Sequence, residues 1–116
     1  LQSARETFLA VARRWPDDAT AWFGLGNTEY RLGLRGPAEA AYRRVLERDP
    51  THAAALNNLA QVMSDRGCAT EARALLARAR PAADSESVAN AIAATDAAVA
   101  AAAAGSASCE PIDGSL

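Results

Sequence analysis

Large apolar side chains are scarce in this chain of 116 residues. Leu, Ile, Val and Phe together number 20, whereas alanine alone contributes 31 residues. That share of large apolar residues is low for a thick globular core. Closely packed helices, whose backbones approach one another over alanine, suit this composition better than a sheet protein with a deep core. The length fits a single domain.

Lysine is absent, so that all 12 basic residues are arginine, which we interpret as a coding bias. The net charge is -2 and the isoelectric point is near 5.3. A nucleic-acid-binding domain usually carries a strong basic excess, which this chain lacks. Charge is divided along the chain, because residues 1–80 carry 12 arginines against 9 acids and residues 81–116 carry 5 acids and no arginine. Neither part reaches the density of a basic arm or an acidic tail.

Long hydrophobic runs are also missing. The longest apolar stretch, residues 88–104, is mostly alanine and contains Asn90, Thr95 and Asp96, so no membrane insertion is expected. Arg5 and Glu6 occupy the place where a signal peptide would need its apolar core. The chain begins without Met, which predicts a fragment or a processed form. Its arginine and alanine content favours a bacterial source and leaves cytoplasm and periplasm equally open.

Residues that carry chemistry are few. Cys68 and Cys109 lie 41 residues apart, which is neither a zinc nor a redox spacing. Two unrelated thiols are the favoured interpretation, and a disulfide from the tail to the helical body is the alternative. The single histidine, His52, is expected at the far end of a helix from Cys68, which argues against a nucleophile pair. Gly24 and Gly26 lie inside a predicted helix and form no phosphate loop. We therefore expect no enzymatic activity, no metal and no cofactor.

An internal repeat of 34 residues is the most informative pattern. Shifting the chain by this period aligns residues of the same kind, including small residues and helix-ending glycines. A backward shift aligns Tyr42 with Phe8 and Pro50 with Pro16. The forward pairs are Trp22 and Leu56, Leu25 and Leu59, Gly26 and Ala60, Gly33 and Gly67, Ala38 and Ala72, and Tyr42 and Leu76.

Each repeat predicts two helices joined by a short turn, because apolar and small residues recur at intervals of three and four. Gly33 and Gly67 end the first helix of each repeat, and Pro50 and Pro81 follow the second. Residues 1–16 contain only a second helix, so their apolar face lacks one neighbour. The predicted helices cover residues 19–32, a segment from Gly36-Pro37 to Asp49, residues 53–66, residues 69–80 and residues 86–104.

Small residues are expected where helices cross, and large residues are expected to fill the gaps between them. Gly26 and Ala60 are the predicted crossing points. The residues predicted to fill the gaps are Trp22, Tyr42, Leu56 and Leu76.

These positions resemble the tetratricopeptide repeat, whose pattern is W-x2-L-G-x2-Y followed by small, aromatic and proline positions. Trp22-Phe23-Gly24-Leu25-Gly26 matches its opening, and Glu29 departs from it where the family prefers tyrosine. The resemblance covers residues 1 to about 80 and implies an all-α fold, a right-handed α-α superhelix, with a half repeat (1–16) and two repeats (17–50 and 51–81). The residues after Pro81 depart from the repeat pattern and predict a C-terminal capping helix (82–105), because a solenoid needs a capping element with one polar face, followed by a tail (106–116).

The resemblance also implies protein-protein interaction, because the first helices of such repeats line a concave groove that binds a peptide. Amide side chains in that groove can donate to and accept from a peptide backbone at once. Aromatic side chains would add apolar pockets, and an arginine would meet a carboxylate. The residues expected to bind the peptide are Phe23, Asn27, Tyr30, Arg31, Asn57, Asn58 and Gln61.

Two other functions remain open. The chain also resembles repeat regions attached to bacterial papain-like cysteine peptidases, in which it would be a non-catalytic part of a larger enzyme. Alternatively, it is a structural module that self-associates as a homodimer. The open N-terminal edge, which contains Leu1, Phe8 and Trp15, would then be the interface.

Overall fold

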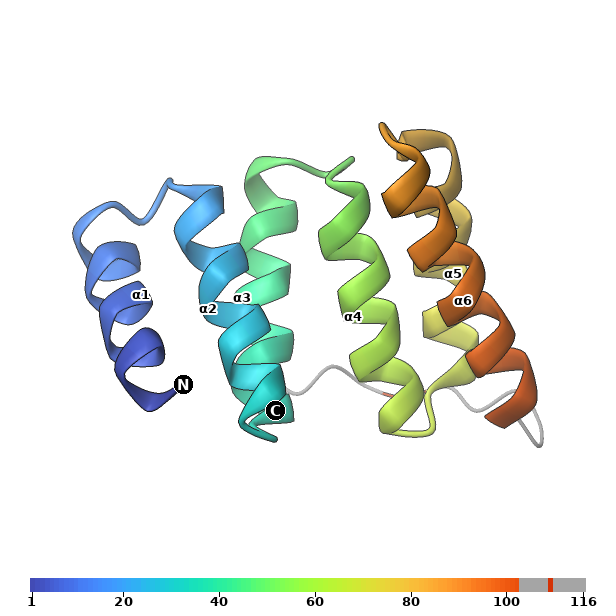
Figure 1. Ribbon diagram of the computed structural model, residues 1–116, viewed down its shortest axis with the longest axis horizontal. Helices are drawn as coiled ribbons and strands as arrows, with labels where there is room; N and C mark the ends of the chain where they lie inside the picture. The colour runs from blue at the N-terminus through green and yellow to red at the C-terminus, as the bar shows by residue number, and fades with distance from the viewer. Residues whose placement is uncertain (103–108, 110–116) are drawn as a thin grey trace. The chain divides into compact units, whose positions relative to one another are not determined.

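The computed structural model describes residues 1–102 and Cys109, and all secondary structure in this part is helical (Figure 1). The chain forms two compact units, Leu1–Pro50 and a second unit that begins at Thr51. No helix among the described residues is long and apolar enough to cross a membrane. The first unit contains α1 (Gln2–Arg14), α2 (Ala19–Arg31) and α3 (Arg35–Arg48). The second contains α4 (Ala53–Asp65), α5 (Ala69–Ala79), the 3-10 turn η1 (Arg80–Ala82) and α6 (Glu86–Ala102).

The helix boundaries agree closely with those expected from the repeat. The largest difference is at Pro81, which was expected to stop the preceding helix directly. Pro81 instead lies inside η1, the tighter helical turn that continues α5. A proline fits there because the first residues of a helix need no N–H donor. The expected last residues of the final helix, 103 and 104, and the tail apart from Cys109 lie outside the described residues.

Local hydrogen bonds explain where the helices begin and end. The Asp18 carboxylate accepts the N–H groups of Thr20 and Ala21, at 3.0 and 3.3 Å, and so caps the start of α2. At the other end of that helix, Gly33 has a φ of 79°. Gly67 has a φ of 81° after α4. Only glycine adopts this left-handed conformation readily, so both glycines end their helices as expected.

In the first unit, glycine allows α2 to approach both neighbouring helices closely. A Cβ atom built at Gly24 would lie 2.4 Å from the Phe8 ring of α1. A Cβ atom at Gly26 would lie 2.7 Å from the Tyr42 ring of α3. These distances are shorter than van der Waals contact, so each ring occupies the space of the missing side chain. The expectation that Gly26 marks a helix crossing is confirmed.

The residues expected to fill the gaps between helices do so with one exception. Tyr42, Leu56 and Leu76 are at most 1% exposed. Trp22, by contrast, remains half-buried, and its indole N–H donates to the carbonyl oxygen of Pro16 at 2.8 Å. Trp22 therefore fills its gap only in part. The indole N–H needs a hydrogen-bond partner, and this requirement favours a position for the ring at the boundary of the core.

In the second unit, α6 packs against both α4 and α5. The apolar side chains of Ile92 and Val99 are buried there, at 3% and 1% exposure. Arg80 forms an ion pair with Asp96 of α6. Ser85 caps the helix, because its hydroxyl oxygen accepts the Val88 N–H at 3.1 Å. The helix thus covers an apolar surface of α4 and α5 and turns most of its alanines outward.

The two cysteines form a disulfide, so the favoured interpretation of two unrelated thiols was wrong. Cys68 is fully buried immediately before α5, and Cys109 lies beside the first turn of that helix. The Cys109 N–H donates to the Glu71 carboxylate at 3.0 Å. The sequence separation alone carries no sign of this contact, because the pairing depends on where the chain lies after α6.

At the N-terminal edge, two large apolar side chains of the first unit are exposed. Leu1 is 51% exposed and Trp15 is 57% exposed. Phe8, the third residue of the expected open face, is instead partly covered by its contact with Gly24. The apolar surface of this edge is therefore smaller than the helical pattern predicted.

The Gly26–Tyr42 contact predicts a coupled effect on stability. Replacing Gly26→Ala gains about 1 kcal/mol in helix propensity but overpacks the buried Tyr42 ring, which costs about 1–3 kcal/mol. We expect a net loss of about 1 kcal/mol and a lower Tm in thermal unfolding followed by circular dichroism. In the Tyr42→Leu background the same change should cost less, because the second repeat combines Ala60 with Leu76. Equal costs in both backgrounds would contradict the contact.

The packing of α6 predicts that its apolar face stabilises the second unit. Ile92→Ala should lower the free energy of unfolding by about 2–4 kcal/mol, because it removes a buried side chain and leaves a cavity. Val88→Ala on the same helix is the control, and its half-buried side chain should cost less than about 1 kcal/mol. Urea unfolding measures both values. Similar losses for the two variants would show that α6 is not anchored through Ile92.

Candidate protein-binding surface

The first group of expected peptide-binding residues lies along one side of α2. Phe23, Asn27 and Tyr30 follow one another at intervals of four and three residues, which places them on a common face. All three are half-buried, and Arg31 at the end of the helix is exposed. This face offers two aromatic rings, an amide and a guanidinium to a partner.

Tyr42 of α3 organises this face from behind. Its hydroxyl donates to the Asn27 side-chain oxygen at 2.6 Å, and its ring centroid lies 6.1 Å from that of Phe23. Because the oxygen of Asn27 is directed to Tyr42, its amide nitrogen is directed away from that hydroxyl. Tyr42 was expected only in the core, and the repeat pattern did not reveal the hydrogen bond between its hydroxyl and Asn27.

The second group lies on α4, in the second unit. Asn58 and Gln61 are half-buried, whereas Asn57 is only 8% exposed. The Asn57 amide nitrogen donates to the Asn58 oxygen at 3.2 Å, and Gln61 donates to the Asp65 carboxylate at 3.1 Å. No donor within the described part of the chain reaches the Asn57 oxygen. Asn58 and Gln61 therefore offer the accessible amides, and Asn57 acts mainly by orienting Asn58.

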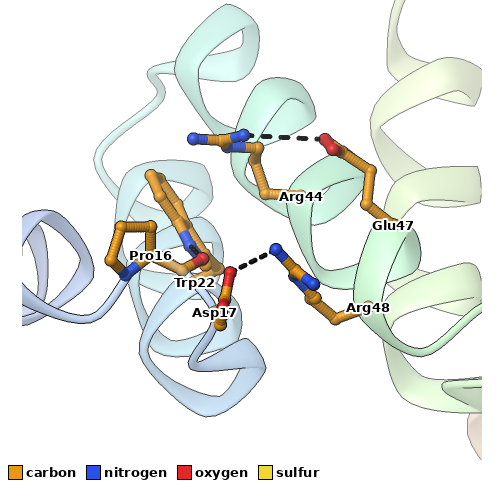
Figure 2. A network of polar contacts seen from close by, with 6 residues as sticks. All are labelled: Pro16, Asp17, Trp22, Arg44, Glu47 and Arg48. Atoms are coloured by element: carbon orange, nitrogen blue, oxygen red, sulfur yellow. Dashed lines mark hydrogen bonds and ion pairs between the residues drawn. The ribbon is translucent and has the colours of Figure 1, made fainter.

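The residues considered for catalysis have structural roles. The His52 Nδ1 atom accepts the Ala55 N–H at 3.0 Å and so caps α4. Cys68, at the opposite end of that helix, is held in the disulfide. Among residues 1–102 and Cys109, no group of three or more His, Cys, Asp or Glu side chains could hold a metal ion. Asp17, beside the cap of α2, forms an ion pair with Arg48 (Figure 2).

One buried carboxylate was not expected from the sequence. Glu29 of α2 is 3% exposed, and its Oε2 atom accepts a hydrogen bond from Arg5 Nε at 3.0 Å. Burial raises the pKa of Glu29 above its ordinary value of 4.5, and the hydrogen bond and charge of Arg5 oppose this increase in part. The departure from the family's tyrosine at this position was visible in the sequence, but its burial was not.

The raised pKa of Glu29 predicts that removing its charge stabilises the folded protein, and that the size of this effect depends on pH. The folded state binds this proton more tightly than the unfolded state, so the contribution of Glu29 to stability falls as pH rises through the raised pKa. Glu29→Gln should therefore raise the Tm at about pH 7 and raise it less at about pH 4, where Glu29 itself is largely protonated.

The exposed carboxylate of Glu47 provides the matched control for this measurement. Glu47→Gln removes the same charge without changing a buried group, so it should alter the Tm little at either pH. Thermal unfolding of the parent and both variants tests the difference. The raised pKa of Glu29 would be refuted if the Tm difference between Glu29→Gln and the parent were smaller at about pH 7 than at about pH 4.

Comparisons with known proteins agree with the repeat geometry. Two family models described as Tetratricopeptide repeat match the chain, one over residues 1–35 and the other over residues 36–95. A search of curated proteins returns no match. Repeats of this family are typically non-catalytic scaffolds that mediate protein-protein interaction. The helices are paired, small residues lie at the helix crossing, and the family matches extend over residues 1–95. The chain therefore belongs to the tetratricopeptide repeat family.

Proposed function

We propose that the chain binds extended segments of a partner protein through the first helix of each repeat, which is α2 in the first unit and α4 in the second. The observation that carries the proposal is the Tyr42–Asn27 hydrogen bond, which holds a partly exposed amide in one orientation beside Phe23. An amide that is already ordered loses less entropy when a ligand binds.

The side chains of the α2 face determine the chemistry that the partner must supply. Phe23 and Tyr30 present apolar rings, so the partner segment carries apolar side chains toward α2. Arg31 is exposed at the end of the helix and suits a carboxylate of the partner. The partner segment is therefore apolar with an acidic residue at one end.

On α4, the amides recognise the partner's main chain rather than its side chains. Asn58 and Gln61 are both half-buried and both already form hydrogen bonds to neighbouring side chains. An amide group can exchange such a bond for one with a peptide N–H or carbonyl without changing charge. This mode of binding accepts many sequences, so α4 supplies affinity and α2 supplies selectivity.

The binding test begins from a library, because the partner is unidentified. Peptides selected from a random phage-displayed library against the chain are synthesised, and their Kd values are measured by fluorescence anisotropy. We expect Tyr30→Ala and Asn58→Ala each to weaken binding about tenfold, which is about 1.4 kcal/mol. Asn27 is kept, because its removal would take away the acceptor of the Tyr42 hydroxyl and alter stability.

Arg73→Ala is the matched control, because Arg73 is exposed on α5, a second helix of a repeat. It should leave the Kd unchanged. Circular dichroism of every variant confirms that it is folded. If Arg73→Ala weakens binding as much as Tyr30→Ala and Asn58→Ala, or if neither of these two changes the Kd, the peptide does not bind to the first helices.

A further inference from the structure

A concave surface lies in the first unit, on a different side of α2 from the proposed peptide-binding residues. It is an open groove with a volume of about 450 Å³. This volume lies in the lower part of the range of roughly 300–1,000 Å³ found for small-ligand sites. Its floor comes from α2, and its walls come from α1 and α3. The apolar lining consists of Leu9, Trp22, Leu25, Pro37, Ala40 and Ala41.

Glu29 contributes a polar group to the floor of this apolar groove. Its Oε2 atom is paired with Arg5, whereas no donor in residues 1–102 or Cys109 reaches its buried Oε1 atom. A buried acceptor without a donor is unfavourable, so a ligand that supplies a donor here gains more than it would at an exposed carboxylate. Arg5 is the more accessible member of the pair, with 29% of its side chain exposed against 4% for Glu29. Its side chain is therefore the group that can shift to admit the donor.

The charges around the groove favour a neutral ligand. Each of the three arginines beside the groove already lies near a carboxylate. A charged ligand would therefore compete with one member of these ion pairs for the other. These pairs are Arg5 with Glu29 at 3.0 Å, Arg43 with Glu39 at 3.0 Å, and Arg44 with Glu47 at 3.9 Å.

Arg44 also favours an aromatic ligand. Its guanidinium lies over the Trp22 ring, 4.8 Å from the ring centroid, and half of its side chain is exposed. Figure 2 shows Arg44 on the side of α3 that faces Trp22. A guanidinium that stacks on one ring can stack on a second with its other face. A flat ring that enters the groove would therefore meet Arg44 as well as the alanines of the wall.

We propose that this groove binds an aromatic side chain of a partner protein that carries one neutral N–H or O–H donor, as tryptophan and tyrosine do. The ring packs against Leu25 and Ala41 and stacks on Arg44, and its donor bonds to Glu29 Oε1. The groove is open to solvent, so one side chain can enter while the rest of the partner chain remains outside. This site is separate from the proposed peptide-binding residues, and the two can be tested independently.

The test uses indole as the probe and 1-methylindole, which lacks the N–H, as its matched control. Both are titrated into the 15N-labelled chain, and the Kd values are obtained from amide chemical shifts. We expect shifts in α2 and α3 around the groove and about tenfold tighter binding of indole. In Glu29→Leu the two Kd values should become equal, whereas Glu6→Gln, which changes an exposed carboxylate outside the groove, should preserve their ratio. Equal affinities in the parent would overturn the proposal.

Further measurements keep the test decisive. Ala40→Phe fills the groove from an exposed wall position, so it should abolish indole binding without lowering the Tm, even if Glu29→Leu fails to fold. Tyr30→Ala should leave indole binding unchanged, which separates this site from the proposed function. A Gly-Gly-Trp-Gly-Gly peptide should bind at least as tightly as indole. Failure of the peptide, or tighter binding of n-butylammonium than of indole, would refute a neutral aromatic side chain of a partner protein as the ligand.

Discussion

The contact between Tyr42 and Gly26 is the interaction on which the first unit depends. The missing side chain of Gly26 allows the tyrosine ring to lie directly against the α2 backbone, and this sets how closely α2 and α3 approach. The same ring approaches Phe23, and its hydroxyl bonds to Asn27. Helix packing and the orientation of a predicted binding residue therefore rest on one side chain. A change that moved Tyr42 would alter the fold and the proposed binding surface together.

The scarcity of large apolar residues has a second consequence, because charged side chains complete the interior of the first unit. Glu29 and Glu39 are at most 3% exposed, and each is paired with an arginine at 3.0 Å. Buried carboxylates of this kind contribute little net stability, since desolvation offsets the attraction. Their effect is to hold charge at defined positions between helices. At Glu29 this leaves an acceptor at the floor of an apolar groove, where a core of leucine would leave none.

The sides of α2 therefore differ in what they offer to a partner. Phe23, Asn27 and Tyr30 form a mixed polar and aromatic face, while Leu25 and Glu29 form the floor of a groove that α1 and α3 enclose. Helical periodicity separates the two sets, because residues that are seven apart share a face and residues that are one apart do not. The two surfaces that we propose on this helix of 13 residues therefore differ in chemistry.

The helices, their turns and the family could be predicted from the sequence, because helix caps and helix-breaking residues act within a few residues. Asp18, Gly33 and Pro50 mark helix boundaries through local backbone chemistry alone. The positions of Phe23, Asn27 and Tyr30 on one face also follow from spacing. Three features required the tertiary structure: the Tyr42–Asn27 bond, the burial of Glu29 against Arg5, and the Cys68–Cys109 disulfide. Their partners lie 15, 24 and 41 residues apart, so each depends on how whole helices pack and on which side chain meets which across the gap.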